Sequence, residues 1–165
     1  MSISAWPSLR LTNIDRSFKK AVGLVRTPSA NEADEVSQAL ATFLVVRTCG
    51  YLECTVHECC IAYIDHKASG PVRSFARSWL NKGNNPTPQR LIDLAARFNT
   101  RFRDDLTNMF DDDDGRLRRE VSLLVNLRNQ IAHGESVNTG ARKALDLVAD
   151  ARIVCDWFIR NLDPR

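Results

Sequence analysis

Apolar residues recur at intervals of three and four along most of this 165-residue chain, and this spacing constrains the fold more than any other feature. They form stripes on one side of a helix over residues 36–61, 91–106 and 144–158. No segment shows the alternation of apolar and polar residues that is typical of a half-buried strand. The sequence therefore predicts an all-α fold.

Capping residues, proline and glycine mark where these helices begin and end. A short helix near residues 13–25 precedes helices that begin at the Ser29–Glu32 capping box, at Pro71, at Thr87–Pro88, near Arg116 and at Thr139. The helix after the capping box runs to about residue 67, and the sequence leaves open whether residues 48–50 bend or divide it. The helix after Pro88 continues to the aspartates at 111–114, and the next one ends at residues 133–134.

These elements predict a helical bundle of four to five main helices. We expect one domain over residues 1–165, with an arm and a short helix at 1–28 and the bundle at 29–161.

The sequence indicates a cytoplasmic protein without a membrane segment. No apolar run approaches the roughly 18–20 residues that a membrane helix needs, and the first residues lack the apolar core of a signal peptide. The five cysteines are an odd number and four of them cluster at 49–60, which favours reduced thiols over a disulfide framework.

Basic residues are unevenly distributed although the net charge is only +3. Residues 67–90 hold five basic side chains and no acidic one, whereas residues 104–114 hold six aspartates and no basic one. A basic segment of this kind is a candidate RNA-binding surface, and the alternative is an ordinary solvated surface. The candidate RNA-binding residues are Arg73, Arg77, Lys82 and Arg90.

Arg128 interrupts an apolar stripe on the helix predicted to end at residue 133. Four apolar residues share a narrow arc of this helix: Leu117, Val121, Leu124 and Ile131. Arg128 lies in the middle of that arc, and an unpaired buried guanidinium is costly. One interpretation is that Arg128 reaches solvent or pairs with an acid such as Glu53 or Glu120, of which we prefer Glu53. The other is that the break in the apolar pattern marks a functional residue.

His133 follows Arg128 by five residues, at the predicted end of the same helix. An imidazole exchanges protons near neutral pH, and a guanidinium binds phosphate oxygens with a planar pair of donors, so the two residues suit phosphodiester chemistry. A lone histidine at a helix end is also typical of a capping or surface residue. Asn129 lies four residues before His133 and is placed to bind a substrate or to orient the imidazole.

The segment LRNQIAHG at residues 127–134 resembles the signature of HEPN ribonucleases, in which an arginine is followed by a polar residue and, a few residues later, by a histidine. No other arginine of the chain precedes a histidine at this distance. In addition, Tyr51 and Glu53 on the long predicted helix resemble the acidic helix of stand-alone bacterial HEPN proteins, the branch that includes the RiboL-PSP group.

This resemblance implies a homodimer in which two copies of Arg128 and His133 form one cleft and cleave RNA without metal or cofactor. The ribose 2′-hydroxyl would attack the adjacent phosphate and leave a cyclic phosphate and a 5′-hydroxyl. His133 would transfer protons and Arg128 would hold the phosphate, with Asn129 and Glu53 completing the candidate catalytic residues. A role as a toxin or phage-defence effector is implied, with an antitoxin or another regulatory protein as a further partner.

One departure from the family concerns regulation. HEPN toxins that are silenced by a nucleotidyltransferase antitoxin carry a tyrosine two residues after the histidine, and Glu135 occupies this position here, so no modification is expected there. The alternative function is a HEPN module without catalysis that binds RNA or protein and dimerises.

A zinc site is a further reading of the cluster Cys54, His57, Cys59 and Cys60. Residues on one helix cannot enclose a tetrahedral ion without ligands from elsewhere, and Cys155 and His66 are the only additions that the sequence suggests. No metal site is therefore predicted.

Overall fold

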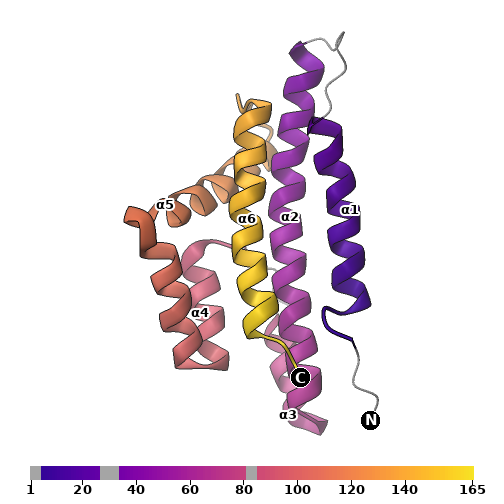
Figure 1. The fold of residues 1–165 in the computed structure, drawn as a ribbon, viewed down its shortest axis with the longest axis vertical. Coiled ribbons are helices and arrows are strands. Elements are labelled where there is room, and N and C mark those ends of the chain that lie inside the picture. Colours follow the sequence, from indigo (N-terminus) through magenta and orange to yellow (C-terminus); the bar gives the residue numbers. More distant parts are fainter. Residues whose placement is uncertain (1–4, 27–33, 81–84) are drawn as a thin grey trace.

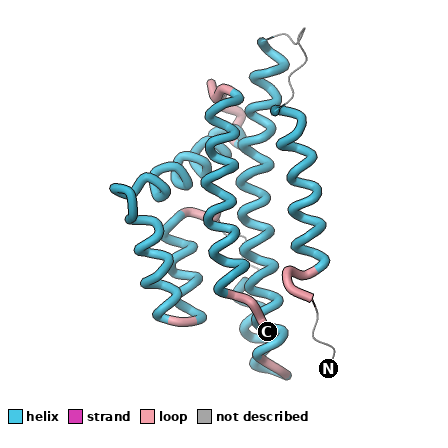
Figure 2. Tube along the Cα trace, in the orientation of Figure 1, coloured by secondary structure: helices cyan, strands magenta, loops and turns pink. Residues whose placement is uncertain are grey.

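The structure is a computed structural model that describes residues 5–26, 34–80 and 85–165, and every regular element in these ranges is a helix (Figures 1 and 2). The helices are α1 (Leu9–Arg26), α2 (Asp34–Lys67), α3 (Gly70–Leu80), α4 (Pro88–Phe98), α5 (Thr100–Ala132) and α6 (Ala141–Asn161). The predicted all-α bundle is confirmed, although the chain divides into helices differently from the prediction.

Helix α2 is the centre of the bundle, and it packs against α1, α3, α5 and α6 (Figure 1). It runs unbroken through Gly50, so the undivided helix is the correct one of the two alternatives. At about 1.5 Å per residue, its 34 residues span roughly 50 Å. The Ser29–Glu32 capping box that predicts its start lies outside the described residues.

By length and composition alone, α2 could cross a membrane, and this corrects the expectation that no segment approaches that length. Half of the apolar window is buried inside the bundle. A long core helix passes the same test, and burial of α2 by its neighbours accounts for its apolar character.

The core is formed by large side chains from five of the helices. The fully buried ones include Phe18, Leu44, Leu52, Leu106, Phe110, Leu124, Leu147 and Phe158. Phe18 of α1 stacks on Tyr51 of α2 with ring centroids 4.1 Å apart, and Trp6 donates its indole N–H to the carbonyl of Ile159 at 2.9 Å. These contacts hold α1 and the segment before it against α2 and α6.

The third predicted helix is wrong in its length, because Asn99 divides it into two. Thr87 caps α4 as predicted, by accepting the backbone N–H of Arg90, and Asn99 follows α4 with extended dihedral angles. The Asn99 side chain then accepts the backbone N–H of Arg101 at 2.8 Å and caps α5. The apolar stripe therefore continues across two antiparallel helices that form a hairpin (Figure 1).

A corner interrupts α5 at residues 112–115 (Figure 1). Asp113, Asp114 and Gly115 have φ values of 51°, 53° and 69°, in the left-handed region. The aspartate run is thus a turn. The second half of α5, which follows this turn, corresponds to the helix predicted over residues 116–133. This second half of α5 returns to α2 and brings residue 128 to it.

Candidate active site

Arg128 lies between α5 and α2, where it forms the expected ion pair with Glu53. Its Nη2 atom is 3.5 Å from Oε2 of Glu53, and the two side chains remain 30% and 33% exposed. Glu120, the other acid considered for Arg128, pairs with Lys143 instead, at 2.6 Å. The guanidinium is therefore paired and still accessible to solvent.

Asn129 supports Arg128 rather than His133. Its Oδ1 atom accepts hydrogen bonds from Nη1 of Arg128 at 3.0 Å and from Nδ2 of Asn85 at 3.3 Å. Asn85 lies in the segment before α4, so the contact links that segment to the end of α5. The alternative in which the Asn129 side chain orients the imidazole is not observed.

Cys49 is a member of this cluster that the sequence did not indicate. It is buried one helical turn before Glu53, and the positive charge of Arg128 acts on its thiol. Burial raises the pKa of Cys49 to about 11, Arg128 opposes this rise, and Glu53 adds to it. The thiol is consequently neutral at physiological pH and fills space beneath the guanidinium.

His133 caps the carboxyl end of α5 and is exposed. Its backbone N–H donates to the carbonyls of Asn129 and Gln130, and Gly134 turns the chain away with a φ of +79°. The imidazole makes no hydrogen bond or ion pair with any residue of the described ranges. Its nitrogens are therefore available to a ligand.

Helix geometry separates the two candidate residues within one chain. Five residues of an α-helix correspond to about 7.5 Å along the axis and a rotation of about 140°. Arg128 faces α2, so His133 points to a different side, at the rim of the bundle.

A cavity of about 480 Å³ opens beside Glu53, which we call the Glu53 cavity. Its walls come from α1, α2, the end of α3, the segment before α4 and α4 itself, and they include Glu53, His57, Asn85 and Arg90. Because Glu53 and Asn85 contact Arg128 and Asn129, this cavity adjoins the candidate site.

The structure describes three of the four candidate RNA-binding residues and places them on two different helices. Arg73 and Arg77 are exposed on α3, and Nη1 of Arg77 lies 3.5 Å from Asp65 of α2. Arg90 is the member that reaches the Glu53 cavity. Lys82 lies outside the described residues.

The cysteine and histidine residues of α2 point in different directions. Cys54 is exposed, whereas Cys59 and Cys60 are buried in the core. In the part of the chain that the structure describes, no group of three metal-ligating side chains is found.

Two residues of the site, Cys49 and Asn85, were not predicted from the sequence, and a sequence pattern could have indicated only the first. Cys49 and Glu53 are four residues apart on one helix, so a search for neighbours of Glu53 finds Cys49. Asn85 meets Asn129 across 44 positions of sequence, and no local pattern indicates that contact.

Comparison with known proteins gives one result. A family model described as RiboL-PSP-HEPN matches residues 10–162, a span that contains all four candidate catalytic residues. No curated protein and no solved structure gives a significant match to the chain.

Proposed function

Since this chain belongs to the RiboL-PSP-HEPN family, we propose that it is a metal-independent endoribonuclease whose catalytic residues are Arg128 and His133. The site is completed by a second copy of the chain, and the protein acts in the cytoplasm as a toxin or defence effector. The observation that carries this proposal is the cluster at residue 128. A guanidinium on an apolar stripe is held in place by Glu53 and Asn129 and yet remains 30% exposed.

Arg128 is suited to bind the phosphate that is cleaved. An RNA phosphate can take the place of the Glu53 carboxylate, whose 3.5 Å contact is longer than a strong charge-assisted hydrogen bond. Asn129 restrains the guanidinium by accepting a hydrogen bond from Nη1, and the arginine side chain stays 30% exposed. The arginine then stabilises the charge that grows on phosphate oxygens in the transition state.

His133 supplies the proton transfers in this scheme. Its imidazole accepts the proton of the ribose 2′-hydroxyl as the 2′-oxygen bonds to phosphorus, and a proton is returned to the 5′-oxygen as the P–O5′ bond breaks. The products are a 2′,3′-cyclic phosphate and a free 5′-hydroxyl. DNA has no 2′-hydroxyl and is not a substrate.

An exposed apolar side of α2 supports dimerisation next to this site. Val36, Phe43 and Val46 are 47%, 43% and 38% exposed and follow one another at helical spacing, and we call them the Phe43 face. Glu53 follows Val46 by seven residues, about two turns along the same side of α2, so the Phe43 face leads to the candidate site. A second copy covering this face would bring its own His133 to the cleft.

One observation favours the alternative of a module without catalysis. The ion pair with Glu53 satisfies Arg128 without any substrate, as expected for a structural arginine. The substitution Glu53→Gln distinguishes the two functions. In a module without catalysis it only weakens a structural ion pair, whereas in an enzyme it also frees Arg128 to bind phosphate.

The proposal is tested by incubating purified variants with a defined RNA in EDTA. We expect the wild-type chain to leave cyclic phosphate ends, and Arg128→Ala and His133→Ala to lower the cleavage rate by about a hundredfold or more. Arg160→Ala and His66→Ala change an exposed arginine and an exposed histidine elsewhere and should have no effect. Circular dichroism of each variant shows whether the fold is intact.

A mixture of the two inactive variants tests the shared cleft. A dimer of one Arg128→Ala chain and one His133→Ala chain retains one intact copy of each residue, so mixing should restore part of the activity. Loss of cleavage in EDTA, or wild-type rates with 2′-O-methyl RNA, would contradict the mechanism. Absence of cleavage by folded, dimeric wild-type protein would favour the module without catalysis.

A further inference from the structure

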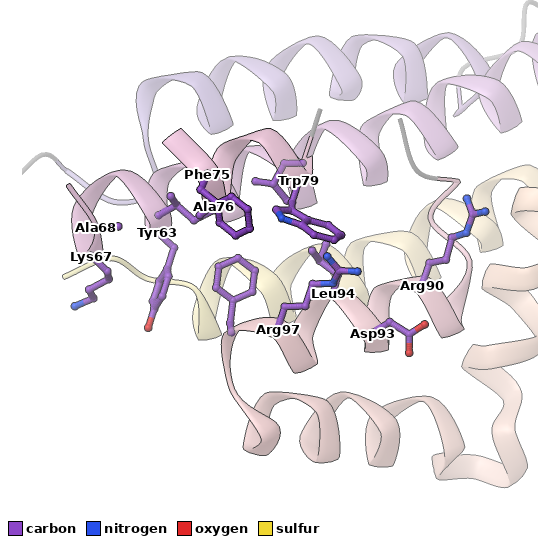
Figure 3. Close-up of a pocket in the computed structure, with 13 residues that line it drawn as sticks. Tyr63, Lys67, Ala68, Phe75, Ala76, Trp79, Arg90, Asp93, Leu94 and Arg97 are labelled. Atoms are coloured by element: carbon purple, nitrogen blue, oxygen red, sulfur yellow. The ribbon is translucent and has the colours of Figure 1, made fainter. Parts of the chain in front are cut away.

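A second cavity, of about 660 Å³, lies between α2, α3 and α4 (Figure 3). We call it the aromatic groove, because Tyr63, Phe75, Trp79 and Phe98 line it. Figure 3 shows the rings of Phe75 and Trp79 on one wall, facing Arg97 and Leu94 on the other. Phe75 and Trp79 are 67% and 47% exposed, which is unusual for large aromatic side chains.

The two walls of this groove are joined by side chains rather than by close helix packing. Among the described helices, α3 packs closely only against α2, and α4 only against α5. None of the 11 residues of α3 is buried. Apart from the contact of Arg97 with Trp79, the space between the walls is open to a ligand.

The aromatic rings are combined with cations. The Arg97 guanidinium lies 4.6 Å from the centroid of the Trp79 ring, and the Phe75 and Trp79 rings meet edge to face at 6.3 Å. Lys67 lies 5.9 Å from the centroid of the Tyr63 ring. Flat apolar faces beside cations are what unpaired nucleobases and their phosphates require.

The charge around the groove favours a polyanion. Lys67, Arg90 and Arg97 line it, against one acidic residue, Asp93. Arg73 of α3 adds a further exposed positive charge.

The aromatic groove adjoins the Glu53 cavity. Leu80, Arg90 and Leu94 line both cavities, so Arg90 stands between the aromatic rings and the acid that pairs with Arg128. A protein partner is the alternative occupant of the groove, but a protein that only covers the rings has no need for a groove next to the candidate active site. The adjacency of the two cavities favours a strand that extends from one to the other across Arg90.

We propose that the aromatic groove binds unpaired bases of a single-stranded RNA, with Phe75, Trp79 and Arg97 stacking on the bases and Arg90 contacting the backbone that leads to the Glu53 cavity. This inference rests on the proposed function for the direction of the strand. Duplex RNA is excluded from the groove, because its bases are already stacked on one another and present no free face.

Binding of a single-stranded, fully 2′-O-methylated octanucleotide, measured by fluorescence anisotropy, tests the proposal without requiring cleavage. We expect Phe75→Ala/Trp79→Ala to weaken binding about tenfold or more, and Arg97→Ala to weaken it less. The control Leu9→Ala/Leu24→Ala removes two exposed apolar side chains from α1, which are 75% and 57% exposed, and should bind like wild type. Annealing the octanucleotide to its complement should also weaken binding to wild type.

A photo-crosslinking arm gives an independent readout. With 4-thiouridine in the strand, we expect crosslinks to the α3 peptide that contains Phe75 and Trp79. Equal affinity of the double variant and wild type, or equal affinity for strand and duplex, would overturn the proposal. If the double variant binds RNA normally but loses self-association in sedimentation, a second copy of the chain occupies the groove. A failure of cleavage alone, with groove-dependent binding intact, would contradict the proposed function and leave this inference standing.

Discussion

Gly134 fixes the direction in which the chain leaves the candidate active site, and a single methyl group tests its importance. Its φ of +79° is unfavourable for any residue with a Cβ atom, and an added Cβ would meet nothing within 4 Å. We therefore expect Gly134→Ala to lower the free energy of unfolding by about 1 kcal/mol through backbone strain alone. Cleavage should also decrease, because the strain is relieved by moving His133.

Gly23→Ala in α1 is the matched control for this change. Its added Cβ also meets nothing within 4 Å, but its backbone is helical, so alanine should raise the stability by about 0.5–1 kcal/mol. Urea unfolding of both variants measures the difference. Effects of the same sign in the two variants would show that the strain at residue 134 is not the cause.

At the residue scale, the sequence was informative where one helix carries the signal. The break in the apolar stripe located Arg128, and the choice of Glu53 as its partner is confirmed by the 3.5 Å contact. The contact of Asn129 with Asn85 could not be predicted, because it depends on how α4 is placed against the end of α5. Catalytic roles for these residues stay predictions.

At the element scale, the corner in α5 contains two aspartates in a conformation that disfavours them. Asp114 has a φ of 53°, and its backbone carbonyl accepts a hydrogen bond from Arg119. A substitution of the side chain preserves this hydrogen bond. We expect Asp114→Gly to stabilise the protein by about 0.5–1 kcal/mol, because relief of left-handed strain exceeds the entropy cost of glycine. At the next position, Gly115→Ala should destabilise it by about 1 kcal/mol.

Thermal unfolding of these two variants measures both effects, and their opposite signs identify the backbone as the cause. A destabilised Asp114→Gly variant would instead show that the exposed carboxylate contributes to the turn.

Helix ends that carry a local signal were predicted well, whereas the division at Asn99 was missed. Thr87 before Pro88 and Gly134 after His133 are local signals, and both helix ends lie where they were expected. Asn99 was passed over because the apolar stripe continues on both sides of it. Two antiparallel helices that bury the same side produce the same periodicity as one longer helix.

At the scale of the whole molecule, the buried thiols should make the fold sensitive to alkaline pH. Burial raises the pKa of Cys60 to about 12 and of Cys49 to about 11, and it also raises the pKa of Cys59 and Cys155. In each case the folded state holds its proton more tightly than the unfolded chain, whose thiols ionise near pH 9. Stability is therefore fully present below pH 9 and is lost as the pH rises from 9 through the folded pKa values.

We expect a loss of roughly 1 kcal/mol for each of these four thiols between pH 8 and pH 10. Urea unfolding in reducing buffer across this range measures the loss, and Cys155→Ala should make it smaller. A free energy of unfolding that stays constant up to pH 10 would contradict the prediction that burial raises the pKa values of these thiols.

The hairpin of α4 and the first half of α5 has a consequence for the motions of the molecule. It joins the rest of α5 at a corner in which residues 113–115 are in the left-handed region, and α4 has α5 as its only close helical neighbour in the described chain. Such a unit can open without unfolding α2 and α6, so its amide protons should exchange with solvent sooner than those of the central helices. The wall of the aromatic groove that carries Arg97 belongs to this unit, and a bound strand would slow the exchange of α4 first.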